Sequence, residues 1–146
     1  HEHIQPGEKQ LIVELNGWKI KPMICYDLRF PVWCKNRLDK DGKFEYDFAF
    51  FVANWPEVRN YPWNMLLIAR AIENQAYVAG INRVGYDING ILYSGNSVII
   101  DPKGKVLANG EEGKERALSV KLSARDLKTF REQFNVGLDW DNFQIK

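Results

Sequence analysis

An apolar run that stops at a cysteine constrains this chain more than any other feature. Residues 22–24 are Pro-Met-Ile, Cys25 follows, and a charged segment then closes on Pro31. Such a run predicts a buried strand, and Pro31 suits the first turn of a helix, where its missing N–H costs nothing. Cys25 would then occupy a sharp strand-to-helix turn, which presents a nucleophile beside backbone amides. A small buried hydrophobic residue is the alternative, and this segment alone leaves both open.

The strand that leads to Cys25 belongs to a predicted hairpin. The dipeptide Asn16-Gly17 separates residues 10–15 from residues 18–24. Asn-Gly is the strongest short signal for a type I′ turn, in which both central residues have positive φ. A hairpin therefore leads directly to the thiol.

The middle of the chain predicts alternating strands and helices. We expect a short helix over residues 32–38 and, from the continuous apolar run 48–53, a strand covered on both faces. Residues 62–77 have helical spacing of their apolar positions, and residues 78–81 form the next strand. This order is typical of an α/β sheet, in which Cys25 and the pair Asn54-Trp55 lie at strand ends.

The second half predicts strands joined by tight turns. We expect a strand over residues 93–100, a type I turn at Asp-Pro-Lys-Gly 101–104, and a returning strand over residues 105–108. Residues 116–122 alternate as a half-buried strand. A mixed sheet in one layered α/β domain spanning residues 1–146 satisfies both halves.

A capped helix and a tail complete the prediction. Ser123 and Asp126 have the spacing of a capping box, and Leu127, Phe130 and Phe134 form the apolar stripe of the helix that follows. Residues 135–146 form an extended tail whose aromatic residues, Trp140 and Phe143, need a neighbour to cover them.

Charge and cysteine content exclude several classes of protein. Lys and Arg number 20 against 19 Asp and Glu, and the two signs are interspersed, which argues against a nucleic-acid or acidic-membrane partner. No apolar segment approaches the roughly 18–20 residues that span a bilayer. Two cysteines are too few for a disulfide scaffold, so a reducing cytoplasm is the expected location.

Few partners are available for a catalytic Cys25. The two histidines, His1 and His3, both precede it, so a downstream Cys-His pair is excluded and a catalytic Cys25 would need a carboxylate as its base. The His and Cys residues show no metal-ligand spacing, and no nucleotide motif occurs, so we expect no cofactor. The pair Arg70 and Glu73 is interpreted as a surface i,i+3 contact, and Cys34 as a core residue.

Five blocks of sequence resemble the nitrilase superfamily of carbon–nitrogen hydrolases, in particular its bacterial omega-amidase branch. They are residues 24–31, 52–56, 69–75, 79–85 and 95–97, in the order and spacing of that family. The resemblance implies an α-β-β-α sandwich in which a Glu, a Lys and a Cys act together on an amide. The chain resembles the C-terminal portion of such a domain, and its beginning without Met suggests a piece of a longer protein.

The resemblance also assigns roles to residues. Cys25 matches the family nucleophile, which attacks an amide and forms a thioester, and the backbone amide of Tyr26 would lie in the oxyanion hole. Asn54 and Trp55 match the substrate pocket. Arg29 is the candidate for a substrate carboxylate, with a salt bridge to Asp27 or to a helix acid as the alternative.

The catalytic Glu and Lys of the family precede the cysteine by more residues than this chain contains. Lys19 and Lys21 lie too close to Cys25 to fill the lysine position, while Glu2 falls near a further family glutamate. We therefore expect an amidase acting on a small ω-amide such as 2-oxoglutaramate, inactive as this chain alone, and a homodimer. A non-catalytic binding module with this fold, or a different amide or nitrile substrate, are the alternatives.

Overall fold

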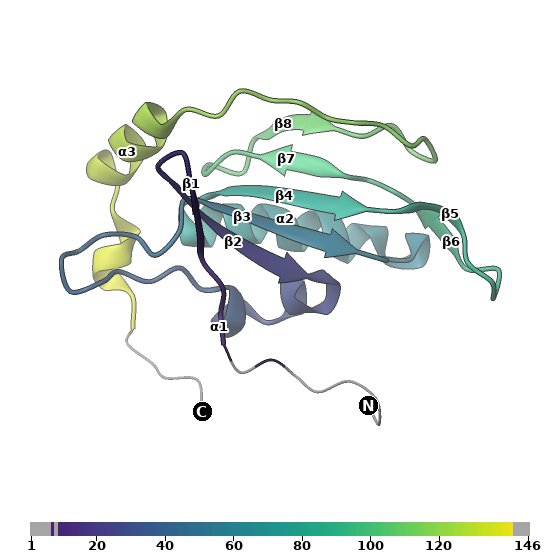
Figure 1. Ribbon diagram of the computed structural model, residues 1–146, viewed down its shortest axis with the longest axis horizontal. Coiled ribbons are helices and arrows are strands. Elements are labelled where there is room, and N and C mark those ends of the chain that lie inside the picture. Colours follow the sequence, from purple (N-terminus) through teal and green to yellow (C-terminus); the bar gives the residue numbers. More distant parts are fainter. Residues whose placement is uncertain (1–6, 8, 142–146) are drawn as a thin grey trace.

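A six-stranded mixed sheet is the centre of the molecule (Figure 1). The computed structural model describes Gly7 and residues 9–141. The strand order is β1-β2-β3-β4-β7-β8, in which β2, β3 and β4 run parallel and the outer pairs are antiparallel. The bounds of these strands are Val13–Leu15, Trp18–Ile24, Phe48–Ala53, Tyr77–Asn82, Val98–Ile100 and Val106–Asn109. The mixed α/β sheet predicted from the sequence is confirmed.

The hairpin before Cys25 has the predicted turn. Asn16 and Gly17 have φ values of 50° and 79°, so both occupy the left-handed region that a type I′ turn requires. Val13 pairs with Ile20 and Leu15 with Trp18 across the hairpin. The turn thereby fixes the register of β2, the strand that ends one residue before the thiol.

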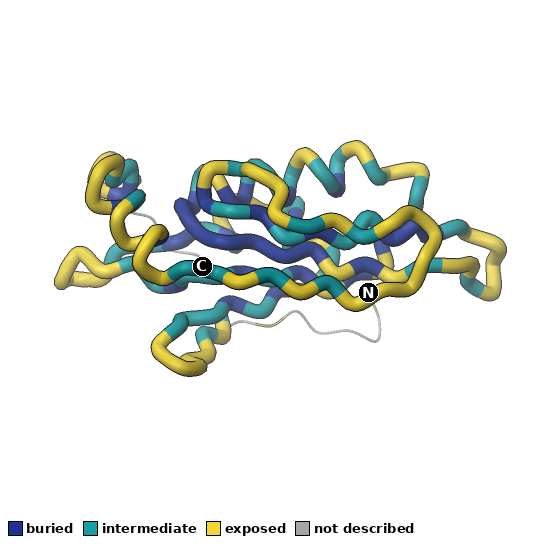
Figure 2. Tube along the Cα trace, turned by 90° about the horizontal axis from the view of Figure 1, so that it is seen from above, coloured by how far each residue is buried: buried dark blue, intermediate teal, exposed yellow. Residues whose placement is uncertain are grey.

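Helix α2 (Asn60–Asn74) covers one face of the parallel strands (Figure 1). Gly80 of β4 permits this contact, because a Cβ there would lie 2.4 Å from a methyl group of Leu67 and 2.7 Å from the ring of Trp63. On β3 the residues of this face, such as Phe51, are fully buried. Buried residues accordingly gather along the central strands, and exposed ones at the loops (Figure 2).

The opposite face of β3 differs from the prediction. Residues 48–53 were expected to be covered on both faces, but Val52 is 49% exposed and Phe48 and Phe50 are only half-buried. Within the part of the chain that the structure describes, a helix packs on the α2 side alone. The apolar residues 48–53 therefore cover one buried face of β3 and one face that the described residues leave partly exposed.

The helix after Pro31 is shorter than predicted. Helix α1 spans Pro31–Cys34, whereas the sequence predicted a helix over residues 32–38. Pro31 lies in its first turn, as expected. Buried donors take its last carbonyls: Lys21 Nζ donates to Trp33 O at 3.0 Å, and Tyr46 OH donates to Cys34 O at 2.7 Å. These bonds replace the next helical turn and end α1.

Two strands of the second half were predicted incorrectly. Residues 93–100 form two strands in different sheets, β6 (Leu92–Ser94) and β7 (Val98–Ile100), because Gly95 and Asn96 have φ values of 83° and 57° and break the extended backbone. Strand β6 pairs with β5 (Val84–Tyr86) in a separate hairpin that the sequence did not indicate. Residues 116–122 alternate between exposed and half-buried but are not a strand.

The turn at 101–104 and the helix cap agree with the prediction. Gly104 N donates to Asp101 O at 2.9 Å. Ser123 Oγ accepts from Asp126 N at 3.1 Å at the start of α3 (Ala124–Gln133). Phe134, predicted on the apolar stripe of this helix, is 63% exposed, because α3 ends at Gln133.

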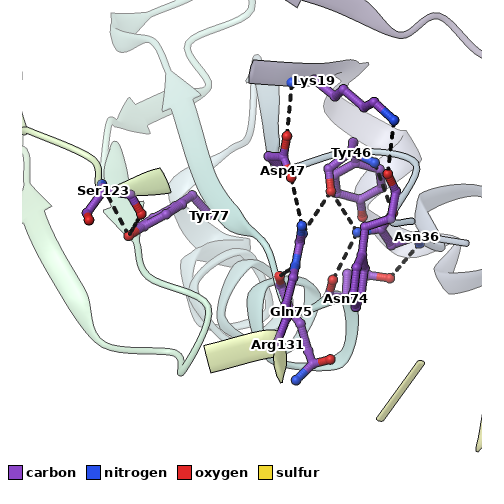
Figure 3. Close-up of polar contacts among 10 residues, drawn as sticks. Lys19, Asn36, Tyr46, Asp47, Asn74, Gln75, Tyr77, Ser123 and Arg131 are labelled. Carbon is purple, nitrogen blue, oxygen red and sulfur yellow. Dashed lines mark hydrogen bonds and ion pairs between the residues drawn. The ribbon is translucent and has the colours of Figure 1, made fainter. Parts of the chain in front are cut away.

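The C-terminal segment is attached to the sheet by a buried arginine. Arg131 donates to Asp47 Oδ1 at 2.7 Å, to Tyr46 O at 2.9 Å and to Gln75 O at 2.9 Å (Figure 3). A 3-10 helix, η3 (Val136–Asp139), follows in the segment expected to be an extended tail.

The aromatic residues of the tail have different outcomes. Trp140 packs edge-on against Phe44, with 5.8 Å between ring centroids, and beneath the ammonium of Lys35. This chain therefore covers Trp140 itself. Phe143 lies outside the described residues.

Candidate active site

Cys25 lies at a strained point of the backbone. It follows β2 directly and begins a 3-10 helix, η1 (Cys25–Arg29), with a φ value of 37°. A non-glycine residue in this region costs about 1–3 kcal/mol, and such strain persists only where surrounding contacts enforce it. The predicted sharp strand-to-helix turn is present, and we call residues 24–30 the elbow.

Side chains hold the carbonyl and amide groups of the elbow. Asp27 Oδ2 accepts from Ile24 N at 2.9 Å, and the thiol of Cys34 donates to Asp27 O at 3.1 Å. Burial raises the pKa of Cys34 to about 11, while Arg70 beside it opposes the rise. Cys34 is therefore a neutral hydrogen-bond donor at ordinary pH, in the core as predicted.

The interpretation of Arg70 and Glu73 as a surface pair was wrong. The two side chains do form an ion pair, at 2.9 Å, but Arg70 is only 4% exposed. Its second terminal nitrogen donates to Leu28 O in the elbow at 2.7 Å. Arg70 lies within the periodic pattern of α2, and this position was the available signal of its burial. The prediction placed Arg70 on the exposed face of the helix, but it lies on the buried face.

A second strand end lies beside the elbow. Asn54 and Trp55 follow β3, which pairs with β2 in parallel, so Val52 stands opposite Ile24. The Sγ of Cys25 is 4.0 Å from the carbonyl oxygen of Asn54. Parallel pairing therefore brings the two polar strand ends to one edge of the sheet, as the sequence predicted.

Asn82, at the end of β4, fixes the segment after β3. Its Oδ1 accepts from Trp55 N at 2.7 Å, and its Nδ2 donates to Trp55 O at 2.9 Å and to Gly95 O at 2.8 Å. Ser97 Oγ completes the arrangement by accepting from Asn82 N at 3.0 Å. We did not identify Asn82 as a site residue, although an asparagine that ends an apolar strand run is a detectable signal.

The segments that follow β2 and β3 form a pocket of about 370 Å³. Its lining contains five predicted residues together with two that were missed, Pro56 and Arg59; the predicted ones are Cys25, Tyr26, Arg29, Asn54 and Trp55. Glu2 lies outside the described residues. The pocket holds two guanidinium groups and, among the residues that the structure describes, no carboxylate.

Arg29 is oriented by an aromatic ring rather than by an acid. Its guanidinium carbon lies 4.8 Å from the centroid of Trp55, and within the described residues no ion pair joins it to Asp27 or to a helix acid. Trp55 is itself fixed, because it is 3% exposed and its indole N–H donates to Arg59 O at 2.7 Å. The alternative of a salt bridge for Arg29 is therefore not realised.

Tyr26 lines the pocket from the second position of η1. Its N–H is among the first of η1, and the first N–H groups of a helix have no partner within the helix. Its side chain is 64% exposed and packs edge-on against Phe30.

Lys21 is held away from this pocket. It is 1% exposed, and its ammonium donates to Gln10 Oε1 at 2.9 Å and to Trp33 O at 3.0 Å. Burial lowers the pKa of Lys21 to about 8, although Glu45 opposes the shift. Lys21 therefore attaches α1 and the N-terminal segment to the sheet.

Lys19 lines a larger hollow of about 450 Å³ near the β1–β2 turn, together with Trp18, Phe44 and Leu127. This hollow lies at the opposite end of the strands from Cys25. We place the candidate site at the smaller pocket, because the thiol and the pocket arginines are there.

Neither a metal site nor a membrane-spanning helix is found among the described residues. Among residues 7 and 9–141, no cluster of three or more His, Cys, Asp or Glu residues could hold a metal ion. The helices within the described segments are also too short or too polar to cross a bilayer.

The chain belongs to the carbon–nitrogen hydrolase family, whose model matches residues 1–132. It is 50% identical over 145 residues to the protein named omega-amidase YafV of Yersinia enterocolitica, covering 99% of this chain and 54% of the relative. It is 43% identical over 119 residues to 2-oxoglutaramate amidase of Bacillus subtilis, covering 80% of this chain and 44% of the relative. The family resemblance predicted from the sequence is confirmed.

The fold has a close structural counterpart. A CN-hydrolase superfamily protein from Xanthomonas campestris, described with an arsenic adduct in its active site, superposes with a TM-score of 0.94 at 44% identity. The match covers 97% of this chain and 54% of that protein. This chain thus spans about half the length of the relatives it matches.

The hydrogen bonds of Asn82 lead to a prediction about stability. Asn82→Ala would leave the Trp55 amide and two carbonyl groups without partners in a buried setting, so we expect a loss of about 2–4 kcal/mol in the free energy of unfolding. Urea denaturation measures this value. Asn89→Ala, at an exposed turn, is the control and should cost less than about 0.5 kcal/mol. A loss below about 1 kcal/mol for Asn82→Ala would show that the hydrogen bonds of Asn82 contribute little to stability.

Proposed function

We propose that Cys25 is the nucleophile of an omega-amidase, which hydrolyses a small ω-amide of a dicarboxylic acid to the acid and ammonia. The observation that carries this proposal is the strained thiol in a pocket that holds two arginines and, among the described residues, no acid. The names of the relatives at 43–50% identity support the same activity.

The proposed reaction has two stages. The Cys25 thiolate attacks the amide carbon, the carbonyl oxygen gains negative charge, and the backbone N–H of Tyr26 donates to it. The C–N bond then breaks, the nitrogen takes up a proton and leaves as ammonia, and a thioester remains. Water adds to the thioester carbon, and the C–S bond breaks to release the acid and restore the thiol. A preorganised donor at the oxyanion typically contributes about 3 kcal/mol.

The substrate is proposed to carry a carboxylate at the end remote from the amide. The guanidinium of Arg29 lies over the ring of Trp55 and has no acid partner among the described residues, so it can bind a carboxylate through two parallel hydrogen bonds. Asn54 and Trp55 would line the space between the carboxylate and the thiol. A 2-oxoglutaramate-like molecule fits this description, whereas a longer nitrile or a neutral amide leaves the arginines unpaired.

The chain alone is proposed not to turn over. The resemblance implies a Glu and a Lys in the catalytic set, and the described lining of the Cys25 pocket includes neither. Without a base to form the thiolate and a proton donor for the leaving nitrogen, the first stage stalls. The binding-module alternative predicts instead that the complete gene product is inactive as well.

We expect Cys25→Ala to abolish ammonia release from 2-oxoglutaramate by the complete gene product, by on the order of 10⁴-fold or more, because no other group can form the thioester. Coupled ammonia detection measures the rate. Thr129→Ala, on the exposed side of α3, is the control and should retain full activity. Equal rates for Cys25→Ala and the unaltered protein would exclude Cys25 as the nucleophile. No activity in the unaltered gene product would favour the binding module.

A homodimer is also proposed. Apolar side chains of α2 form one exposed stripe, in which Tyr61 is 77%, Met65 43% and Ile72 50% exposed. Phe30 and Val32, just after the elbow, are 47% and 51% exposed. A second copy of the protein would cover these surfaces.

The two free thiols suit a reducing compartment, so a cytoplasmic location remains the prediction.

The dimer is tested by multi-angle light scattering on the complete gene product at micromolar concentration. We expect twice the monomer mass, and Met65→Glu should shift the protein towards the monomer because it buries a charge in the apolar stripe. A monomeric mass for the unaltered protein would refute the homodimer.

A further inference from the structure

Arg70 occupies an unusual position for a charged residue. It belongs to α2, the helix behind the sheet (Figure 1), yet it is 4% exposed and reaches the elbow at the end of β2. One terminal nitrogen donates to Leu28 O at 2.7 Å, and the other donates to Glu73 Oε1 at 2.9 Å. Its Nε has no hydrogen-bond partner among the described residues. A buried guanidinium with such an incomplete set of partners is costly to retain for stability alone.

The carbonyl that Arg70 holds has no access to water. Leu28 is fully buried, so its oxygen depends on a protein donor. The preceding carbonyl, Asp27 O, accepts from the Cys34 thiol and from Phe30 N. Side chains from α1 and α2 therefore bind two successive carbonyls of η1 from behind, while Cys25 faces the pocket from the first residue of the same helix.

This attachment explains how the strained backbone at Cys25 persists. A residue with a φ value of 37° relaxes to ordinary values unless the chain on both sides is fixed. The β2 ladder fixes the chain before it, and the bonds to Asp27 O and Leu28 O fix the chain after it. Of these bonds, the one from Arg70 is charge-assisted and therefore the strongest.

We infer that Arg70 is a positioning residue for the nucleophile: through Leu28 O it keeps the elbow in the conformation that aims the Cys25 thiol at the substrate carbonyl. The inference rests on the proposed amidase function only for its effect on turnover. Glu73 supports this role because it accepts from the other terminal nitrogen, Nη1, and so orients the guanidinium group. Arg70 itself does not line the pocket.

The test compares four variants of the complete gene product. We expect Arg70→Met to lower kcat about 10- to 100-fold, since misplacement by about 1 Å can have an effect of this size, and to raise KM by a smaller factor. Arg70→Lys should recover part of kcat, because an ammonium group can donate to Leu28 O or to Glu73 but cannot reach both as the guanidinium group does. Leu127→Ala, a buried residue of α3 remote from the elbow, destabilises the fold and should leave kcat within about twofold below its melting temperature. Cys25→Ala sets the background rate.

Two results would overturn the inference. One is a kcat for folded Arg70→Met within twofold of the unaltered protein. The other is a loss of kcat in Leu127→Ala as large as in Arg70→Met, which would show that Arg70 affects turnover only through the stability of the fold.

A second readout separates this inference from the proposed function. If the gene product releases no ammonia, the proposed function fails, but alkylation of Cys25 by iodoacetamide still reports the elbow. Release of Leu28 O should free the half-buried thiol from its place beside Asn54 O, so we expect alkylation at least about threefold faster in Arg70→Met and unchanged in Leu127→Ala. An alkylation rate in Arg70→Met equal to or below that of the unaltered protein contradicts the positioning role.

Discussion

Parallel pairing of β2, β3 and β4 is the constraint on which the candidate site depends. Strands that run in one direction end at one edge, so the residues that follow each strand are brought together although the chain separates them by about thirty residues. Cys25 and Asn54 follow β2 and β3 directly, and Asn82 is the last residue of β4. The register places Ile24 opposite Val52 and Val52 opposite Ile81, so the three strand ends lie side by side rather than staggered.

Buried polar side chains then convert this edge into a defined geometry. Asn82 fixes the segment that carries Trp55. Arg70 and Cys34 donate hydrogen bonds to carbonyl groups of the elbow. Lys21 attaches α1 to the sheet. Each of these side chains is hydrogen-bonded to backbone carbonyl or amide groups of a loop or of a short helix, so its burial specifies one local backbone conformation. Arg131 does the same at the other end of the sheet, for the loop at Asp47 (Figure 3).

The sequence predicted the features that local chemistry determines and missed those set by distant contacts. Asn16-Gly17, the Asp101 turn and the Ser123 cap each depend on a few neighbouring residues, and all three were found. Pocket residues on strand ends were found because apolar runs end visibly. The burial of Arg70, the early end of α1 and the division of residues 93–100 depend on side chains 12 or more residues away or on backbone angles at Gly95 and Asn96. No local pattern identifies the distant partners of Arg70 or of α1, whereas Gly95 and Asn96 are residue types that permit positive φ and so offered a local signal for the break.

Trapping the covalent intermediate tests the central claim, that Cys25 is the nucleophile, most directly. The complete gene product is mixed with 2-oxoglutaramate, quenched in acid within one turnover and digested, and the peptides are analysed by mass spectrometry. The account predicts the acyl mass of a thioester on the peptide that carries Cys25, and no such mass on the peptide that carries the buried Cys34. Ammonia release without an adduct on Cys25 under any quench time, or an adduct on Cys34, would contradict it.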